Sequence, residues 1–277
     1  MTLPKIPLVA VLGCPITHSK SPLLHGTWLK QLGIKGHYIP VDVDPVNLAD
    51  VLRSMPKMGF VGANVTLPHK QAVMALADSI SDRAAIIGAA NTLTFREDGG
   101  FFADNTDGYG FIENIRQSQP DWSADGGPAV VLGAGGASRA ILSSLIEAGA
   151  PEIILSNRTR ARADQLRDDF GARISVVDWT KVSSYVEQAH TLVNTTSLGM
   201  ENKPELSLNL EGLQSETLVT DIVYTPLETP LLKTAREKGC KTVDGLGMLI
   251  YQAIPGFERW FGQKPTVNED IRALLLA

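Results

Sequence analysis

The feature that most constrains this chain is an alternation of short β-branched runs with longer helical patterns, which continues from one end to the other. Such alternation is typical of parallel sheets covered by helices, and it is not expected of a β-sandwich or a helix bundle. The sequence therefore predicts an α/β fold. Because the chain has 277 residues and a domain takes roughly 150, we expect about two domains.

The first part of the chain predicts a sheet that ends in a hairpin. Strands are expected over 8–13, 37–43 and 60–67, and helices over 22–32, 46–54 and 107–117. The turn Glu97-Asp98-Gly99-Gly100 separates two β-prone runs, so a hairpin is expected over 91–95 and 101–103. The polar stretch 118–127 contains a proline and two glycines, and we expect it to be a loop or linker.

A second alternation starts at Ala129. Strands are expected over 129–132, 152–156, 174–178, 191–195, 218–223 and 241–243, with helices between most of them. The last two segments, 248–261 and 267–275, have helical patterns and no strand after them. We therefore expect these two helices to cover an earlier part of the chain.

The balance of charge disfavours two classes of partner. The chain has 25 Lys+Arg and 30 Asp+Glu, which gives a net charge of −5. Proteins that bind nucleic acid or anionic membranes in general need a surplus of Lys and Arg to displace counterions from phosphates. We therefore expect a small-molecule ligand, with neither nucleic acid nor a membrane as partner. As a separate expectation, the protein is a monomer or a homodimer.

Cysteine and histidine usage disfavours a disulfide framework and a structural zinc site. The two cysteines, Cys14 and Cys240, are far apart, and the five histidines form no paired motif, so no metal is expected. The segment Val11-Leu12-Gly13-Cys14 looks like a lipoprotein cleavage site, but Pro7 shortens the apolar run before it below the minimum of about 7 residues for a signal peptide. We expect a buried strand there and a location in the cytoplasm.

A glycine-rich loop follows the strand predicted at 129–132 and precedes a helix. It reads Gly133-Ala134-Gly135-Gly136-Ala137-Ser138. Glycines let the backbone approach phosphates, and the first turn of a helix presents N–H groups to them, so this context suits a dinucleotide pyrophosphate. Ser138 stands where a third glycine would stand. A strand-to-helix turn without a ligand is an equal alternative for this loop taken alone.

The end of the next strand indicates which dinucleotide binds. Asn157 follows Gly133 by 24 residues, near the position that reads the ribose. An NAD enzyme is expected to carry Asp or Glu there, whereas this chain has Asn157 followed by several arginines. Arginine pairs with a 2′-phosphate, which a carboxylate would repel. The alternative is a solvated basic helix start, which the helix dipole disfavours. The cofactor predicted is NADP.

Polar residues of the first part fall at or near predicted strand or hairpin ends, where open parallel sheets place ligands. Ser19 and Ser21 precede the first helix, and there an N-cap Ser21 followed by Pro22 is the alternative. Thr66 and Lys70 follow the third strand. Lys70 is predicted at a helix N-terminus, against the dipole, which is a departure expected of functional sites.

Two further positions close the hairpin region. Asn91 follows two alanines and has an ordinary turn residue as its alternative. Asp107 starts the connecting helix and has a helix cap as its alternative, with Gly108 and Gly110 allowing close packing.

Taken together, these motifs resemble the shikimate dehydrogenase family from end to end. The segments that carry the resemblance are Gly13-Cys14-Pro15-Ile16-Thr17-His18-Ser19-Lys20-Ser21-Pro22, 62–70, Asn91-Thr92-Leu93, 104–108, 133–138, Asn157-Arg158-Thr159 and Asp244-Gly245-Leu246-Gly247-Met248-Leu249. Their order and spacing are more specific than any one of them. The resemblance implies NADP-dependent reduction of 3-dehydroshikimate to shikimate, a step of aromatic amino-acid biosynthesis. It also implies a substrate-binding α/β domain over 1–106 and 245–277, and a Rossmann-type NADP-binding domain over 107–244.

The resemblance also implies site residues. Ser19 and Ser21 would hold the substrate carboxylate with Tyr224 nearby. Thr66, Asn91 and Gln252 would bond ring hydroxyls. Lys70 and Asp107 would be the catalytic pair, and Asp107 would also touch the substrate. The cofactor would be held by Gly133, Ala134, Gly135, Gly136, Ala137, Asn157, Arg158, Thr159, Arg162, Ile222 and Gly245, with Thr196 also on the nicotinamide side.

Two departures and two alternatives accompany the resemblance. Cys14 stands where the family often has Asn, and His69 stands where an apolar or aromatic residue often precedes the lysine. A quinate/shikimate dehydrogenase with relaxed substrate and NAD use is one alternative, which Asn157 disfavours. A non-catalytic protein that binds dehydroshikimate is the other, and such a protein would be free to lose Lys70 or Asp107.

Overall fold

The computed structural model describes residues 6–277 of the chain, which divide into two compact units. The first unit takes the chain up to Thr106 and again from Gln252 to the end, and the second runs from Asp107 to Tyr251. Each contains one sheet of six strands. The α/β fold class that the sequence predicts is confirmed.

The first unit holds the following elements: β1 (Leu8–Gly13), α1 (Ser21–Gln31), β2 (His37–Asp42), η1 (Pro45–Asn47), α2 (Leu48–Ser54), η2 (Pro56–Met58), β3 (Phe60–Val65), η3 (Ala72–Leu76), β4 (Ser79–Ile80), α3 (Asp82–Ile87), β5 (Thr92–Phe95), β6 (Phe101–Asp104), α9 (Ala253–Phe261) and α10 (Glu269–Leu276). The elements labelled η are 3₁₀ helices.

The sheet of the first unit is mixed. Its order is β2-β1-β3-β5-β6-β4, in which β1 pairs in parallel with both β2 and β3, and β5 is antiparallel to β3 and β6. The antiparallel pair of β5 and β6 is the predicted hairpin. Because β5 runs against its neighbours, its first residues lie at the same edge of the sheet as the last residues of β1, β3 and β6.

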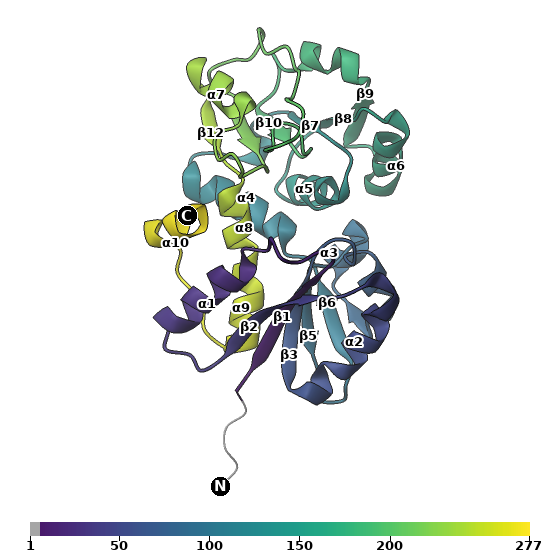
Figure 1. The fold of residues 1–277 in the computed structure, drawn as a ribbon. Coiled ribbons are helices and arrows are strands. Elements are labelled where there is room, and N and C mark those ends of the chain that lie inside the picture. Colours follow the sequence, from purple (N-terminus) through teal and green to yellow (C-terminus); the bar gives the residue numbers. More distant parts are fainter. Residues whose placement is uncertain (1–5) are drawn as a thin grey trace. The chain divides into compact units, whose positions relative to one another are not determined.

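Helices cover both faces of this sheet (Figure 1). On one face α2 packs its buried Leu48 and Leu52 against residues of β1 and β3. On the other face α1 contacts β2, and α9 contacts α1, β3 and β5. The expectation that the final helices cover an earlier part of the chain is therefore confirmed.

A tryptophan seats α9 on the sheet. The indole Nε1 of Trp260 donates to the carbonyl oxygen of Leu93 at 2.8 Å. The indole lies against the backbone of β3, because a Cβ atom added at Gly62 would come within 1.9 Å of that same nitrogen. Glycine at 62 is thus required for the last part of the chain to dock on the first sheet.

The second unit holds α4 (Asp107–Ser118), η4 (Ala124–Gly126), β7 (Ala129–Leu132), α5 (Gly136–Glu147), β8 (Ile153–Ser156), α6 (Arg160–Phe170), β9 (Ile174–Val177), η5 (Trp179–Tyr185), β10 (Thr191–Asn194), β11 (Leu218–Asp221), α7 (Pro230–Glu237), β12 (Lys241–Val243) and α8 (Leu246–Tyr251).

All strands of the second sheet are parallel, in the order β12-β11-β10-β7-β8-β9. Numbered within the unit, this is the 3-2-1-4-5-6 order of the doubly wound dinucleotide-binding fold. The strand order reverses between β7 and β10, and ligands of such sheets bind outside the strand ends at that point. The glycine loop leaves β7 there.

Several local differences separate the structure from the predicted elements. The short strand β4 and the helix α3, which Ser81 caps by accepting from the N–H of Ala84, were not predicted. The helix predicted over 248–261 is broken into α8 and α9 at Gln252. Pro255 has no N–H to give to the carbonyl four residues earlier, which accounts for the break.

The helix α8 packs within the second unit. A Cβ atom added at Gly247 would come within 1.7 Å of Asn114 Oδ1, and Asn114 Nδ2 donates to the carbonyl oxygen of Asp244 at 2.7 Å. Through these contacts with α4, residues 245–251 group with the second unit. Within residues 6–277, none of the helices is long and apolar enough to cross a membrane.

Candidate active site

The polar residues that the sequence singles out in the first unit gather at one edge of its sheet. The segment after β3 runs beside the end of β1 and the loop after it, with Thr66 N–H donating to the Leu12 carbonyl and Cys14 N–H to that of Leu67. Beside them, the N–H of Asn91 donates to the carbonyl oxygen of Asp104 at 3.0 Å. Main-chain hydrogen bonds thus join the loops that carry the candidate substrate residues.

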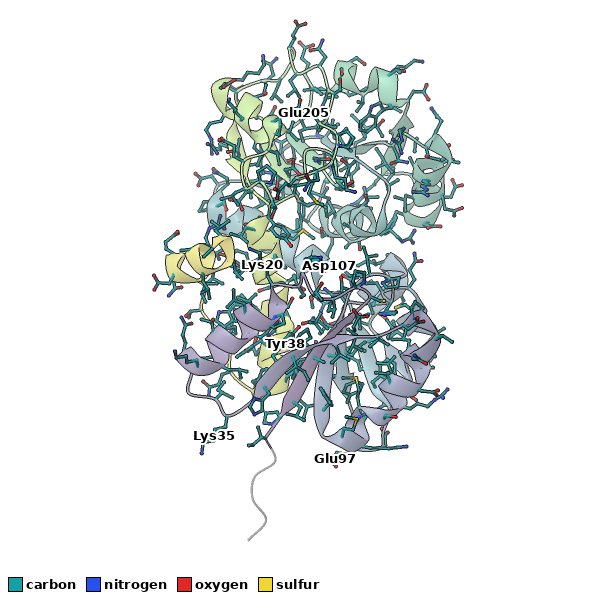
Figure 2. The ribbon with its side chains drawn as sticks, in the orientation of Figure 1. Lys20, Lys35, Tyr38, Glu97, Asp107 and Glu205 are labelled. Atoms are coloured by element: carbon teal, nitrogen blue, oxygen red, sulfur yellow. The ribbon has the colours of Figure 1, made fainter. Side chains whose placement is uncertain are left out.

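The two serines lie where the loop after β1 enters α1. The N–H of Ser21 donates to Ser19 Oγ at 3.3 Å. Ser21 is the first residue of α1 and Lys20 is at the capping position, so the alternative in which Ser21 is the N-cap does not hold. The Ser21 hydroxyl instead hydrogen-bonds the phenol of Tyr38. Burial of Tyr38 keeps the pKa of this phenol far above its usual range. Figure 2 labels Tyr38 among the strands of the first unit.

Lys70 lies in a turn and not at a helix N-terminus, so that prediction is wrong. The segment from Leu67 to Gln71 forms turns, and the 3₁₀ helix begins only at Ala72. The main chain of Lys70 is nevertheless held, because its carbonyl oxygen accepts the N–H of Ala90 at 2.8 Å. This bond pairs Lys70 with Ala90, the residue that precedes Asn91.

Asn91 and Gln252 are brought together although 161 positions separate them. Asn91 is buried, and its Nδ2 lies 3.2 Å from Gln252 Oε1. Asn91 comes from the start of β5 and Gln252 from the start of α9. The docking of α9 on the first sheet therefore delivers the second amide to the first.

Asp107 begins both α4 and the second unit. Its side chain is buried, with 8% of its surface exposed. The next residue allows the close packing that the sequence predicts, because a Cβ atom at Gly108 would lie 2.8 Å from the carbonyl oxygen of Ala140 on α5. Replacing Gly108 would therefore disturb the position from which Asp107 projects.

The glycine loop of the second unit requires glycine at its first position. Gly133 has φ +109°, and a Cβ atom there would lie 2.7 Å from Thr195 Oγ1. At Gly135 and Gly136 a Cβ atom would meet nothing within 4 Å among the described residues. The loop is thus pressed against the end of β10 on one side and open over its later glycines, as a backbone that receives a pyrophosphate requires.

Ser138, in the place of a third glycine, is part of the support of this loop. Its side chain is fully buried, and its Oγ accepts the N–H of Gly135 at 3.0 Å. The same Oγ lies 2.6 Å from Thr195 Oγ1, which donates to the carbonyl oxygen of Leu132. The serine therefore ties the glycine loop to the neighbouring strand through its hydroxyl.

Asn157 joins two loops that the sequence assigns to the cofactor. Its Oδ1 accepts the N–H of Ala134 at 3.1 Å, and its Nδ2 donates to the carbonyl oxygen of Thr159 at 2.8 Å. One end of the amide thus holds the glycine loop and the other end holds the loop that carries Arg158. An aspartate could accept the first of these bonds but has no N–H to donate in the second.

The arginines after β8 differ in their partners. Arg160, the first residue of α6, pairs with Asp178 at 2.5 Å and with Asp164 at 3.5 Å, which explains a cation at this helix start. Arg158 and Arg162 are exposed and make no ion pair with any residue in the described range 6–277. These two guanidinium groups have the charge and exposure that a 2′-phosphate needs.

The remaining cofactor candidates lie at the ends of β10, β11 and β12. Gly245 approaches the loop after β11 closely, since a Cβ atom there would lie 2.2 Å from the Ile222 carbonyl oxygen. The structure therefore places Ile222 beside Gly245. At the end of β10, Asn194 Oδ1 accepts from both the N–H and the hydroxyl of Thr196. Burial raises the pKa of Tyr224, which keeps its phenol a hydrogen-bond donor.

Sequence reasoning missed three residues that support these loops. Asp221 is buried and accepts from Asn194 Nδ2, Val223 N–H and Thr229 Oγ1 at 2.8–3.0 Å, which joins the ends of β10 and β11. In the first unit, Tyr38 donates to Asn64 Oδ1 at 2.6 Å. The available signal was an asparagine inside the otherwise apolar strand β3. Over residues 6–277, no cluster of three or more His, Cys, Asp or Glu is placed to hold a metal.

Comparison with known proteins covers nearly the whole chain. Three family models match: the shikimate dehydrogenase substrate binding domain over residues 11–93, shikimate / quinate 5-dehydrogenase over 116–221, and the shikimate 5'-dehydrogenase C-terminal domain over 245–275. A curated protein named shikimate dehydrogenase (NADP(+)) from Roseobacter denitrificans is 61% identical over 276 residues, covering 100% of both chains. The chain belongs to the shikimate dehydrogenase family. A second member, from Paracoccus denitrificans, is 61% identical and covers 98% of this chain and 96% of its own.

Solved structures of the shikimate dehydrogenase family share the fold. Shikimate 5-dehydrogenase from Thermus thermophilus, in complex with NADP(H) and shikimate, has a TM-score of 0.87 at 37% identity and covers 98% of this chain and 99% of its own. Quinate dehydrogenase from Corynebacterium glutamicum, in complex with NAD, has a TM-score of 0.91 at 30% identity with the same coverage. Both a shikimate and a quinate enzyme are therefore among its structural relatives.

Both departures from the pattern of the shikimate dehydrogenase family have partners in the structure. The thiol of Cys14 hydrogen-bonds Asp42, and this bond raises the thiol's pKa. The imidazole of His69 is buried, with Nε2 lying 2.8 Å from the carbonyl oxygen of Val43. Asp42 and Val43 are consecutive residues at the end of β2. Each departure is thus accommodated by a polar contact with the same short segment.

Proposed function

We propose that this chain catalyses the NADP-dependent, reversible reduction of 3-dehydroshikimate to shikimate, a step in the biosynthesis of aromatic amino acids. The observation that carries the proposal is the likeness at 61% identity, over both complete chains, to a protein named shikimate dehydrogenase (NADP(+)). Lys70 and Asp107, the two residues that the reaction needs for proton transfer, are both present.

The first unit supplies most contacts to the substrate. Ser19 and Ser21, just before and at the start of α1, hold its carboxylate, and the Ser21 hydroxyl turns from Tyr38 to the carboxylate when the substrate binds. Thr66, Asn91 and Gln252 bond its ring hydroxyls, and the hydrogen bond between Asn91 and Gln252 supports this assignment. Tyr224 of the second unit contributes a donor to the carboxylate, since burial keeps its phenol protonated.

Lys70 and Asp107 handle the proton that accompanies the redox step. NADPH supplies a hydride to the carbonyl carbon when it is bound, and the oxygen becomes an alkoxide unless it receives a proton. Lys70 gives that proton as the general acid, and Asp107 orients the ammonium or shares the proton. In the direction of shikimate oxidation the same pair removes the hydroxyl proton. The held main chain of Lys70 supports its assignment as the positioned acid.

The second unit holds the cofactor. Residues 133–137 receive the pyrophosphate on open backbone at the start of α5. Asn157, Arg158, Thr159 and Arg162 surround the 2′-phosphate, and the absence of ion pairs at the two arginines, among residues 6–277, supports this role. Ile222, Gly245 and Thr196 lie along the nicotinamide.

A quinate/shikimate dehydrogenase with NAD use is the second candidate. The likeness to the quinate dehydrogenase that binds NAD, at a TM-score of 0.91, favours it. The residues after β8 disfavour it, because Asn157 offers no carboxylate to a ribose 2′-hydroxyl and instead binds two loops of its own unit.

Absorbance of the reduced nicotinamide tests both candidates in one experiment. The purified protein is incubated with shikimate or quinate, each with NADP⁺ or NAD⁺, under identical conditions. We expect rapid reduction only with shikimate and NADP⁺. Comparable rates with quinate or NAD⁺ would establish the second candidate. No reduction in any combination, from protein with a cooperative thermal transition, would leave a non-catalytic dehydroshikimate-binding protein.

We further propose that the enzyme works in the cytoplasm, as a monomer or homodimer, on small molecules and without a nucleic-acid or membrane partner. The net charge of −5 supports the last part, since it offers no general surplus of cations to phosphates. Light scattering coupled to size exclusion measures the assembly, and a mass above that of two chains would contradict it.

A further inference from the structure

Two buried threonines surround the side-chain oxygen of Asn91. Thr92 Oγ1 donates to Asn91 Oδ1 at 2.8 Å, and Thr106 Oγ1 lies 3.1 Å from the same oxygen. The N–H of Thr106 also donates to it at 2.9 Å. Both threonine residues have 0% of their surface exposed. Three protein donors therefore converge on one amide oxygen.

The backbone donor decides which way the Asn91 amide faces. An N–H group can only donate, so the atom 2.9 Å from Thr106 N must be the oxygen and not the nitrogen of the amide. With the oxygen committed to these donors, the Nδ2 edge faces Gln252, whose Oε1 it reaches at 3.2 Å. Asn91 is thus held as a donor toward Gln252.

A second layer holds the threonine next to Asn91. Asn64 Nδ2 donates to Thr92 Oγ1 at 3.3 Å and to the carbonyl oxygen of Asn91 at 3.0 Å. These two donations turn Asn64 Oδ1 toward Tyr38, whose hydroxyl donates to it at 2.6 Å. Tyr38 in turn hydrogen-bonds Ser21. The orientation of each group follows from that of its neighbour, because each hydroxyl has a single proton to give.

We propose that Thr92 and Thr106 are positioning residues that fix Asn91 as a hydrogen-bond donor to a ring oxygen of the substrate. This proposal rests on the proposed function. Without the two hydroxyls, the amide of Asn91 loses two of its three orienting donors and rotates or tilts. Its N–H edge is then no longer held beside Gln252. The loss acts on substrate binding, since neither threonine is among the residues assigned to the cofactor or to proton transfer.

The chain offers a matched control on the same strand. Thr94, two residues after Thr92 on β5, has a buried hydroxyl oxygen with no hydrogen-bond partner among residues 6–277. Thr92→Val and Thr94→Val each replace a threonine hydroxyl on strand β5 with a methyl group. We expect Thr92→Val to raise KM for shikimate about tenfold and to leave kcat and KM for NADP⁺ within about threefold. Thr94→Val should leave all three constants unchanged.

Two further variants complete the kinetic test. Thr106→Val should raise KM for shikimate in the same way, and it serves if Thr92→Val does not fold. Thr92→Ser restores the hydroxyl and should restore KM. The proposal would be overturned if KM for shikimate were unchanged in both Thr92→Val and Thr106→Val, or if it rose equally in Thr94→Val. A serine variant that behaves like the valine variant would also overturn it.

A readout without catalysis separates this proposal from the proposed function. In ¹⁵N-labelled protein, the side-chain amide signals of Asn91 are identified by their loss in Asn91→Asp. They should shift in Thr92→Val and remain in place in Thr94→Val. Such a shift in a protein that does not oxidise shikimate would overturn the proposed function and keep the orienting role. Unshifted signals in a protein that is active on shikimate would overturn the orienting role alone.

Discussion

The imidazole Nε2 of His69 lies 2.8 Å from the carbonyl oxygen of Val43, and the histidine residue has 1% of its surface exposed. Because a carbonyl oxygen only accepts, Nε2 carries the proton of this bond. The bond ties the turn that precedes Lys70 to the residue that follows β2. The turn is also held from the other side, where Ala90 N–H donates to Lys70.

We expect His69→Phe to lower both stability and turnover. Phenylalanine keeps a ring in place but leaves the buried carbonyl of Val43 without its donor, which costs about 1–3 kcal/mol of unfolding free energy. The loosened turn should lower kcat about tenfold, since catalysis is sensitive to small displacements of the acid. Urea unfolding and shikimate oxidation measure the two effects. His69→Gln returns an N–H donor and should recover part of both, whereas a phenylalanine variant equal to the unmodified enzyme would disprove the anchoring role.

A buried histidine should make the protein less stable in mild acid. His25 stacks on Tyr38 with ring centroids 3.9 Å apart, and neither of its ring nitrogens has a hydrogen-bond partner among residues 6–277. Burial lowers the pKa of His25 to about 3. Between this value and the usual pKa of about 6.5, the unfolded chain binds a proton that the folded chain does not. The contribution of His25 to stability is therefore complete above about pH 6.5 and falls below it by about 1.4 kcal/mol per pH unit.

Denaturant unfolding from pH 7.5 to 5 measures this loss. In His25→Phe, which keeps an aromatic ring against Tyr38, the fall in stability below about pH 6.5 should be shallower than in the unmodified protein. His37→Gln changes an exposed histidine next to Tyr38 and should keep the original slope. Equal slopes in all three proteins would contradict the assignment to His25.

The cofactor preference should depend on Arg158 and much less on Arg160. Arg158→Ala removes a guanidinium group that no carboxylate engages within residues 6–277, and we expect KM for NADP⁺ to rise roughly 10- to 100-fold. The guanidinium of Arg160 is engaged by Asp178, so Arg160→Ala should have a smaller effect. Neither change should alter KM for NAD⁺, which lacks the 2′-phosphate. Equal losses with both cofactors would place Arg158 elsewhere.

Removal of the Lys70 amine should abolish most of the turnover. A positioned acid contributes about 10²- to 10⁴-fold to such a step, so Lys70→Ala should lower kcat by that factor. Binding of NADPH, measured by its fluorescence, should remain. Lys57→Ala removes an exposed lysine of the same unit and is the control. Undiminished turnover in Lys70→Ala would remove this residue from the mechanism.

Local patterns in the sequence carry much of the fold. The strand Leu8–Gly13 and the strand before the glycine loop were predicted with the observed bounds, because each is an apolar run closed by glycine. The two-residue strand β4 is too short to leave a pattern. The failure at Lys70 has a different cause: the dipole argument needs a helix that starts at that residue, and the chain instead forms turns up to Gln71.

The hydrogen bonds that hold the site residues were harder to predict from the sequence than the site residues themselves. Ser21, Asn91 and Gln252 could be named from motifs, but the bonds that orient them join residues far apart in the sequence. Tyr38 and Asn64 are 26 positions apart, and Asn91 and Thr106 are 15 apart. Such pairings depend on strand register. The parallel register of β2, β1 and β3 decides the first pairing, and the antiparallel placement of β5 between β3 and β6 decides the second. No single segment contains that information.

The division of the chain has a consequence for its synthesis. The first unit is made of two segments, and its second segment starts at Gln252, after the whole of the second unit. A ribosome therefore releases every residue of the cofactor unit before it releases α9, whose Trp260 covers the first sheet. During translation every residue of the second unit is made first, and the part of the first sheet that α9 packs against stays uncovered until α9 emerges. Loss of residues 252–277 would thus expose the surface that α9 packs against to chaperones and proteases while leaving the inserted unit intact.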